Sequence, residues 1–380
     1  MRIQSIRAHA LSVPLTIDVP GAGKYQESFG CCVVEVETDD GVIGHGLTGI
    51  TQEQAIAPIV AQVIAPALVG TDPLAHEARW EQMYWLMSSR GQTGYAQHAV
   101  AAVDIALWDI KGRVLGLPIW RLLGGARNSV PVYSTFGFDF LSKDELVCAA
   151  RAISAKGWKH LKMVVGHRAL QRRDLPGGRD LASIIQEDAR RVRSVREALD
   201  EDVWLYIDAN CSLDAYHAGR LANMVADCGI GFFEEPITQN DAGAMAALRQ
   251  MTGMPTACGQ NEGLAHRFRD WLVAGSLDFV QPNVVISAGF TQCVRIAALA
   301  NAFNVAVTNG GAFPLHNMHL QAGVANGTKV EWHLPVVALM EQIYEGFPVP
   351  DAGLLQMSDA PGLGFHLRRE ALQEFAVAAR

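Results

Sequence analysis

Three polar residues, each following an apolar run, stand at equal intervals along the chain. Asp208 lies in VWLYIDAN, Glu234 in GFFEEP and Gln260 in TACGQNEG, so each position is 26 residues from the next. This interval accommodates a strand, a loop and a helix that returns to the next parallel strand. Because the carboxyl ends of parallel barrel strands meet at one mouth, the spacing predicts that the three side chains converge there.

These positions carry oxygen donors, and neither His nor Cys occupies them. Hard oxygen ligands favour Mg²⁺, with Mn²⁺ as the alternative, over zinc. Asp208 and Glu234 are two predicted ligands. The third is either Gln260 or Glu262, because residues two apart on a strand point to the same face. A divalent cation beside substrate oxygens acts as a Lewis acid, so the pattern indicates a metal-dependent enzyme.

Apolar runs alternate with helical patterns from about residue 130 onward, and eight of them are strand candidates: VPVYSTFG, HLKMVVG, VWLYIDAN, GFFEEP, PTACGQNE, LDFVQPN, VAVTNGG and VEWH. Eight strands with helical spacers predict an α/β fold of the TIM-barrel type. The start of the chain differs, because IQSIRAHAL and CCVVEVETDDGVIGHG alternate in the manner of paired strands. Helical patterns follow at 53–68, 74–87 and 93–115.

The change of pattern predicts three units. Residues 1–125 form an α+β capping domain, residues 126–345 form the barrel, and residues 346–380 are a segment that packs on the capping domain. The polar, glycine-containing stretch at about 17–30 is expected to be a loop long enough to act as a lid.

Composition excludes several classes of partner. The chain has 380 residues, a formal net charge of −8 and no run of Lys and Arg that would follow a phosphate backbone, so nucleic acid is not expected. No stretch reaches the roughly 20 apolar residues of a membrane span, and the start lacks the features of a signal peptide. A cytoplasmic protein without a membrane partner is therefore expected.

Five motifs together resemble the enolase superfamily, in particular the mandelate racemase-like group that includes many acid-sugar dehydratases. They are AAVDIALWDIKGR, GWKHLKM, IDAN, EEP and APGLGF. The resemblance covers nearly the whole chain. It implies a modified (β/α)₇β barrel beneath an α+β capping domain, an active site between the barrel mouth and the cap loops, Mg²⁺ held by Asp208 and Glu234, and a homo-oligomer.

The chain departs from the family pattern at the acid-base positions. The second barrel strand of such enzymes often carries Lys-x-Lys, and here the pair is Lys162 and Val164. The customary His of the seventh strand falls at Asn309 or Gly310, and its Asp partner on the sixth strand falls at Asn283. A racemase needs acid-base groups on two faces of its substrate, so these losses favour a one-sided elimination.

The remaining catalytic candidates are therefore drawn from the barrel floor and the cap. Lys162 is expected to be an electrostatic partner for the substrate carboxylate or a base with a depressed pKa near the metal. His45 and Tyr95 are the predicted acid-base groups of the cap, although each has an alternative role as a packing residue. The predicted substrate-binding residues are Tyr25, Asn210, Asn309, His316 and Glu331.

The leading interpretation is a Mg²⁺-dependent dehydratase of a polyhydroxylated small-molecule acid, an aldonate or aldarate, that abstracts the proton α to the carboxylate and expels the β-hydroxyl as water. The product would be a 2-keto-3-deoxy acid. An epimerase, racemase or lactone cycloisomerase using the same intermediate is the first alternative. A catalytically silent barrel that binds a sugar acid is the second.

Overall fold

An antiparallel sheet of three strands opens the chain, in the order β1 (Ile3–Val19), β2 (Gly23–Thr38) and β3 (Ile43–Gly49). In β1, buried side chains such as Leu11, Val13 and Leu15 alternate with exposed ones, as expected for a sheet with one covered face. The computed structural model describes residues 1–175 and 177–377.

The predicted lid at 17–30 is not a loop. The register of β1 and β2 continues to the pair Val19 and Gly23, so most of this stretch forms the end of a long hairpin. Tyr25 and Phe29 are four residues apart in β2 and therefore lie on the same face of the hairpin.

Helices complete the cap at the three predicted places and at one further short stretch that was not predicted. The first stretch combines two α-helices with a π-helical segment, and the elements are α1 (Glu53–Ile59), η1 (Val60–Ile64), α2 (Ala65–Leu68), α3 (His76–Met87), α4 (Tyr95–Leu115) and α5 (Ile119–Leu122). Strand β3 lies directly on α4 because it carries Gly44 and Gly46. A Cβ atom at Gly46 would overlap the carbonyl oxygen of Ala102.

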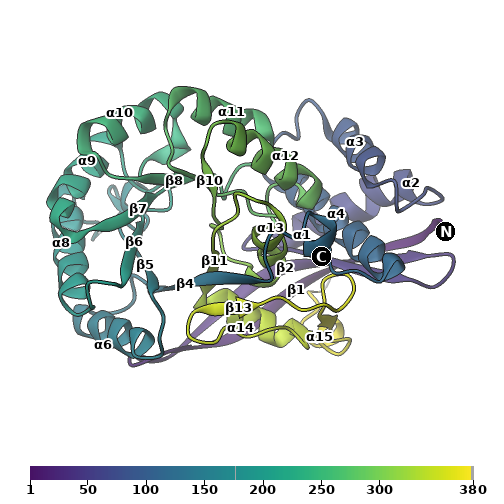
Figure 1. The fold of residues 1–380 in the computed structure, drawn as a ribbon, viewed down its shortest axis with the longest axis horizontal. Coiled ribbons are helices and arrows are strands. Elements are labelled where there is room, and N and C mark those ends of the chain that lie inside the picture. The colour runs from purple at the N-terminus through teal and green to yellow at the C-terminus, as the bar shows by residue number, and fades with distance from the viewer. Residues whose placement is uncertain (176, 378–380) are drawn as a thin grey trace.

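Eight parallel strands form the barrel, and Figure 1 shows them inside an arc of helices. They are β4 (Ser129–Gly137), β5 (His160–Val164), β6 (Trp204–Asp208), β7 (Ile230–Glu234), β8 (Thr256–Cys258), β9 (Phe279–Val280), β10 (Ala306–Val307) and β11 (Val330–His333). Strand β11 pairs with β4. The ring closes where the amide of Val307 donates to Asn326 O at 2.9 Å and that of Asn309 to Lys329 O at 3.1 Å.

The connecting elements are α6 (Lys143–Ser154), α7 (Ala169–Arg172), α8 (Leu181–Glu197), α9 (Ala215–Met224), η2 (Ala226–Cys228), η3 (Thr238–Asn240), α10 (Ala242–Thr252), α11 (Ala265–Ala274), α12 (Gly289–Ala302), α13 (Pro314–Gly323) and α14 (Leu334–Ile343). Local sequence sets several of their starts. Ser142 and Glu145 form a capping box at α6, while Asp180, Asp214 and Asp241 cap α8, α9 and α10 through their side chains.

The end of the chain contacts both the cap and the barrel. It contains β12 (Tyr344–Glu345), β13 (Leu354–Gln356), β14 (His366–Leu367) and α15 (Ala371–Glu374). Strand β13 pairs with β4, and the amide of Ser12 in β1 donates to Phe375 O at 3.0 Å. In Figure 1 this segment runs beside β1 and below the barrel.

Buried polar contacts fix the cap over the barrel near β9 and α12. Asp104 of α4 accepts hydrogen bonds from Thr291 N at 3.0 Å and Thr291 Oγ1 at 2.6 Å, and the indole of Trp80 donates to Ala288 O at 2.9 Å. The α4 helix is therefore held at the barrel mouth. Within the described ranges, no helix is both long and apolar enough to cross a membrane.

Candidate active site

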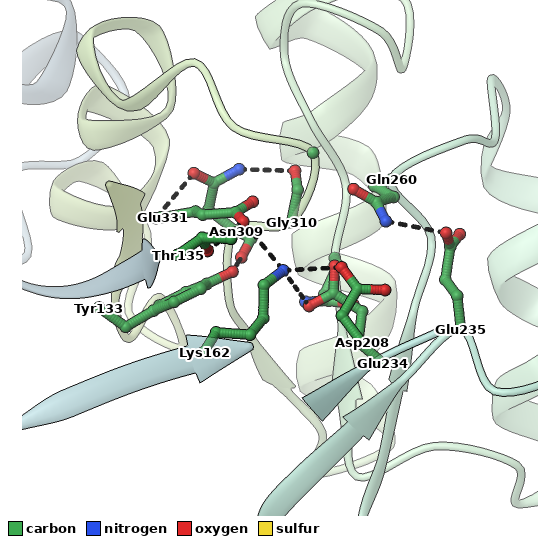
Figure 2. A network of polar contacts seen from close by, with 12 residues as sticks. Tyr133, Thr135, Lys162, Asp208, Glu234, Glu235, Gln260, Asn309, Gly310 and Glu331 are labelled. Atoms are coloured by element: carbon green, nitrogen blue, oxygen red, sulfur yellow. Dashed lines mark hydrogen bonds and ion pairs between the residues drawn. The ribbon is translucent and has the colours of Figure 1, made fainter. Parts of the chain in front are cut away.

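Three carboxylates converge on one ammonium group at the barrel mouth (Figure 2). Lys162 Nζ lies 3.0 Å from Asp208 Oδ2, 2.8 Å from Glu234 Oε2 and 2.9 Å from Glu331 Oε1. The parallel register explains the arrangement, because Asp208 ends β6 directly beside Glu234 at the end of β7. The predicted convergence of Asp208 and Glu234 is thus present in the structure.

A cavity of about 500 Å³ lies over this cluster. Its floor comes from the ends of barrel strands and its roof from the cap, and it is lined by Ile17, Glu27, Phe29, Ile50, His98, Thr135, Phe138, Asp139, Phe140, Val164, His167, Arg168, Asp208, Asn210, Gln260, Asn261, Ile286, Gly311, Ala312, Glu331, His333 and Pro335. The volume is that of a small-molecule site.

Gln260, and not Glu262, faces the cavity beside Asp208. The Gln260 amide donates from Nε2 to Glu235 Oε2 at 2.8 Å, which leaves its Oε1 to act as an acceptor. Glu262 is directed elsewhere, since its Oε1 lies 3.3 Å from Arg267 Nη2. The expectation that Glu262 would reach the mouth assumed that the strand continues, but β8 ends at Cys258 and the turn that follows breaks the two-residue alternation.

Glu235 is a functional candidate that the sequence reasoning missed. It is buried and accepts hydrogen bonds from Gln260 and also from Asn240 and Asn261. Burial, with a further contribution from Asp208, raises the pKa of Glu235 to about 7. The position of Glu235 in the EEP motif can be read from the sequence. The direction of its side chain depends on a left-handed backbone with a φ of 41°, which sequence alone does not reveal.

The donors at the mouth fit a divalent cation. Glu234 Oε1 is fully buried and has no hydrogen-bond partner among the described residues, so one carboxylate oxygen remains available. Asp208 and Gln260 supply further oxygens, and both residues line the cavity. No group of three or more His, Cys, Asp or Glu side chains within the described ranges is arranged to hold a metal ion.

The charges around Lys162 contradict one of its two predicted roles, that of a base with a depressed pKa. Burial alone would lower the pKa of Lys162, but the negative charges of Asp208, Glu234 and Glu331 raise it well above its usual value. This environment therefore keeps Lys162 positively charged and does not turn it into a base with a depressed pKa. Burial in turn raises the pKa of Glu234, with a further contribution from Asp208.

Structural amides occupy the two positions at which the resemblance implies a His-Asp dyad. Asn283 Nδ2 donates to Gly310 O at 2.8 Å and to Gly311 O at 2.9 Å. Asn309 accepts from Glu331 N at 3.0 Å and donates to Gly310 O at 2.8 Å, so its side chain supports the loop after β10. Asn309 was a predicted substrate-binding residue. Its side chain is fully buried in contacts with the chain itself, and it does not line the cavity.

His45 and His316 lie in one buried aromatic cluster, away from the cavity-lining residues. The ring centroids of His45 and His316 are 5.4 Å and 5.7 Å from that of Tyr344, and Phe365 packs against both histidines. The backbone N–H of His45 donates a hydrogen bond to Asp109 Oδ2 at 3.1 Å. His45 was predicted to be an acid-base group of the cap and His316 a substrate-binding residue, but neither lines the cavity. Strand β3 instead directs His45 toward the C-terminal segment, and α13 directs His316 to the same place.

Tyr25 and Tyr95 also occupy positions other than those expected. The Tyr25 hydroxyl donates to Glu145 Oε1 at 3.2 Å and its ring contacts Phe140, so it joins the hairpin to α6. Tyr95 is the first residue of α4 and is 48% exposed. Neither side chain lines the described cavity.

Asn210 and Glu331 do line the cavity. The amide of Asn210 donates to Asp208 Oδ1 at 2.8 Å from a left-handed backbone with a φ of 45°, which turns the chain at the end of β6. Glu331 accepts from Thr135 Oγ1 at 2.5 Å and from Ala312 N at 2.7 Å. Burial opposes ionisation of Glu331, but Lys162, His333 and the hydrogen bond from Thr135 keep its pKa below the usual value.

Three imidazoles on the cavity wall complete the site. They belong to His98 at the start of α4, His167 after β5 and His333 at the end of β11. His333 lies two residues after Glu331, so strand parity could have identified it. His98 lies one helical turn after Tyr95, and only the placement of α4 over the mouth shows that the later residue faces inward.

Fold and site together define a cap-and-barrel protein of the enolase type. The family model of the mandelate racemase / muconate lactonizing enzyme N-terminal domain matches residues 11–124. The family model of enolase C-terminal domain-like proteins matches residues 145–371. The chain belongs to the mandelate racemase/muconate lactonizing enzyme group of the enolase superfamily, and the resemblance found in its motifs is confirmed.

Individual relatives are similar over most of their length. The 3,6-anhydro-alpha-L-galactonate cycloisomerase of Streptomyces coelicolor is 32% identical over 99% of this chain and 99% of its own. The L-rhamnonate dehydratase of Saccharopolyspora erythraea is 30% identical over 90% of this chain and 84% of its own. The crystal structure of a racemase from Streptomyces coelicolor A3(2) with bound magnesium superposes with a TM-score of 0.87 and 30% identity, covering 99% of this chain and all of that one.

Proposed function

We propose that this protein is a Mg²⁺-dependent dehydratase that acts on a polyhydroxylated acid, an aldonate or aldarate. The observation that carries the proposal is the group of Asp208, Glu234 and Gln260 beside a buried Lys162, beneath a cavity closed by the cap. Membership of the enolase superfamily supports chemistry at the carbon α to a carboxylate. Magnesium in a similar racemase structure supports the choice of metal.

Asp208, Glu234 and the Gln260 amide oxygen are the residues that would hold the cation. When bound, Mg²⁺ supplies Lewis-acid stabilisation of the negative charge that develops on the substrate carboxylate. Lys162 adds a fixed positive charge from below, because three carboxylates hold it ionised. Glu331 is oriented by Thr135 and Ala312 and can accept a hydrogen bond from a substrate hydroxyl.

The residues at the two dyad positions, Asn283 and Asn309, favour elimination over racemisation. Racemisation requires a proton donor and acceptor on opposite faces of the α-carbon. Asn283 and Asn309 occupy the positions that would serve one face, and both amides are bound to the loop after β10. Val164 occupies the second position of the Lys-x-Lys pair. An elimination needs proton transfer on one side only, and this chain retains that possibility.

A cycloisomerase is the second candidate, and a specific observation favours it. The cycloisomerase relative covers 99% of this chain, whereas the dehydratase relative covers 90%. The first chemical step is the same in both reactions. If the oxygen on the β-carbon belongs to a ring, its expulsion opens the ring without loss of water.

The test is a screen of sugar acids, their lactones and their anhydro forms with the Mg²⁺-loaded protein. Semicarbazide absorbance detects 2-keto products, and mass spectrometry separates loss of water from isomerisation. Activity should disappear with EDTA and in Asp208→Asn, and it should persist in Glu262→Gln, whose side chain is directed to Arg267.

Other outcomes of this screen would contradict the proposal. Exchange of the α-proton with D₂O without any keto product would indicate an epimerase or racemase. Binding of sugar acids without exchange or product would indicate a catalytically silent homologue.

A further inference from the structure

The proposed reaction needs a proton-transfer group, and the expected ones are not available in the cavity. Lys162 is enclosed by carboxylates, His45 is buried in another cluster, and Tyr95 does not line the cavity. The candidates are therefore the three imidazoles of the cavity wall, those of His98, His167 and His333.

His98 differs from the other two because a neighbouring side chain fixes its orientation. Its Nδ1 lies 2.6 Å from Oγ1 of Thr48, a fully buried residue of β3. Nε2 of His167 lies 3.8 Å from Asp139 Oδ2, and the ring of His333 packs edge-on against Phe138 with its Nδ1 lacking a partner among the described residues. A base held by a third group is the usual arrangement in acid-base catalysis.

The hydrogen bond to Thr48 leaves Nε2 of His98 for a ligand. This nitrogen has no hydrogen-bond partner in the described part of the chain, and it is not fully enclosed by protein atoms. Because His98 lines the cavity, the free nitrogen is accessible from it. The α4 helix carries His98 in the cap, whereas Asp208, Gln260 and Glu331 lie at the ends of barrel strands. The imidazole and the predicted metal ligands therefore belong to opposite walls.

The surroundings of His98 keep the imidazole neutral. Apolar side chains of Phe29, Ile50 and Ile286 line the same cavity. Burial lowers the pKa of His98 to about 4, so at neutral pH the ring can accept a proton. An anionic intermediate in the same cavity would favour the protonated ring, and this is the charge change that a catalytic base requires.

We propose that His98, oriented by Thr48, is the catalytic residue that transfers the proton in this site. The inference rests on the proposed function. Nε2 takes the proton from the α-carbon, and the electron pair of the broken C–H bond forms the C=C bond to the β-carbon. The β C–O bond breaks with its electron pair on oxygen, which takes the proton back from Nε2 and leaves as water. The enol then tautomerises to the 2-keto acid, so the only net change is loss of water.

Kinetics of His98→Gln test the role directly, because glutamine keeps a polar amide near the position of Nε2 but cannot shuttle a proton. We expect kcat to fall by about 10²–10⁴-fold with KM within about threefold, as for loss of a general base. His366→Gln is the matched control, since this histidine is exposed on β14, and its kcat should equal that of the wild type. A His98→Gln enzyme with wild-type kcat would overturn the assignment.

Thr48 is a positioning residue in this scheme, and a pair of variants tests it. Thr48→Val keeps the shape without the hydroxyl, and we expect about a tenfold loss of kcat, equivalent to about 1.4 kcal/mol of transition-state stabilisation. Thr48→Ser keeps the hydroxyl and should restore kcat. Equal losses in both variants would show that packing of Thr48, and not its hydrogen bond to His98, matters for the rate.

A binding experiment separates failure of this inference from failure of the proposed function. Tartronate, a 2-hydroxy acid without a leaving β-oxygen, is titrated with Mg²⁺ into the protein. Calorimetry measures binding, and NMR follows the His98 Cε1–H resonance, assigned by its loss in His98→Gln. Binding that shifts this resonance supports the inference. Binding that leaves it unchanged overturns the inference alone, and absence of binding by tartronate and by every sugar acid contradicts the proposed function and the inference with it.

Discussion

Replacing Lys162 by Met should destabilise the metal-free protein by an amount that depends strongly on pH. The ammonium group is fully buried and within 3.0 Å of three carboxylates. Without it, Asp208, Glu234 and Glu331 would share a buried site with no positive charge. We expect at least one of them to become protonated in the folded variant, because burial already raises the pKa of Glu234.

The magnitude follows from the cost of that proton. At pH 7, protonating a carboxyl group whose unfolded pKa is about 4.3 costs about 3.7 kcal/mol, from about 1.36 kcal/mol per pH unit. This agrees with the roughly 3–5 kcal/mol lost when one partner of a buried ion pair is removed. An acid whose pKa is raised on folding loses stability as the pH rises above its unfolded pKa. The deficit of the variant should therefore shrink to about 1 kcal/mol at pH 5.

Urea unfolding with EDTA at pH 7 and pH 5 measures both values. Lys159→Met is the matched control, because Lys159 pairs with Asp202 at the surface, where the two side chains are 49% and 64% exposed. Its loss should cost no more than about 1 kcal/mol at either pH. A Lys162→Met deficit below about 1 kcal/mol at pH 7, or one that is the same at pH 5, would refute the reasoning.

Three further outcomes are expected. Gln260→Ala should weaken Mg²⁺ binding by at least about tenfold in calorimetry. Glu262→Ala should leave Mg²⁺ binding unchanged, because Glu262 is directed to Arg267. Weaker binding in Glu262→Ala than in Gln260→Ala would place the third ligand at Glu262. Gly46→Ala should lower the free energy of unfolding by about 1–3 kcal/mol, because the added methyl group overlaps α4. An unchanged free energy of unfolding would mean that β3 and α4 separate easily. Burial lowers the pKa of His319 from its ordinary value of 6.5 to about 4, so stability should be lost as the pH falls from 6.5 to 4. His319→Leu should reduce this loss in urea titrations, and an identical pH dependence would assign the loss to other groups.

The sequence alone determined the architecture and the polar floor of the site. Eight apolar runs with helical spacers predicted the barrel, because parallel strands joined by helices have few other ways to bury their faces. Regular spacing brought Asp208 and Glu234 together, and the register of β6 and β7 places them side by side. The motifs were specific enough to identify the superfamily.

Only the tertiary structure decided which other side chains reach the cavity. Tyr95 and His98 are one turn apart in the same helix, and the angle at which α4 lies on the barrel selects the second. His45 lies in β3, whose residues are buried on both faces, and this strand directs the imidazole toward Tyr344. Local sequence sets the period of each element, whereas the direction of a side chain in the cap depends on contacts with residues far away in the chain, and no local pattern encodes those contacts.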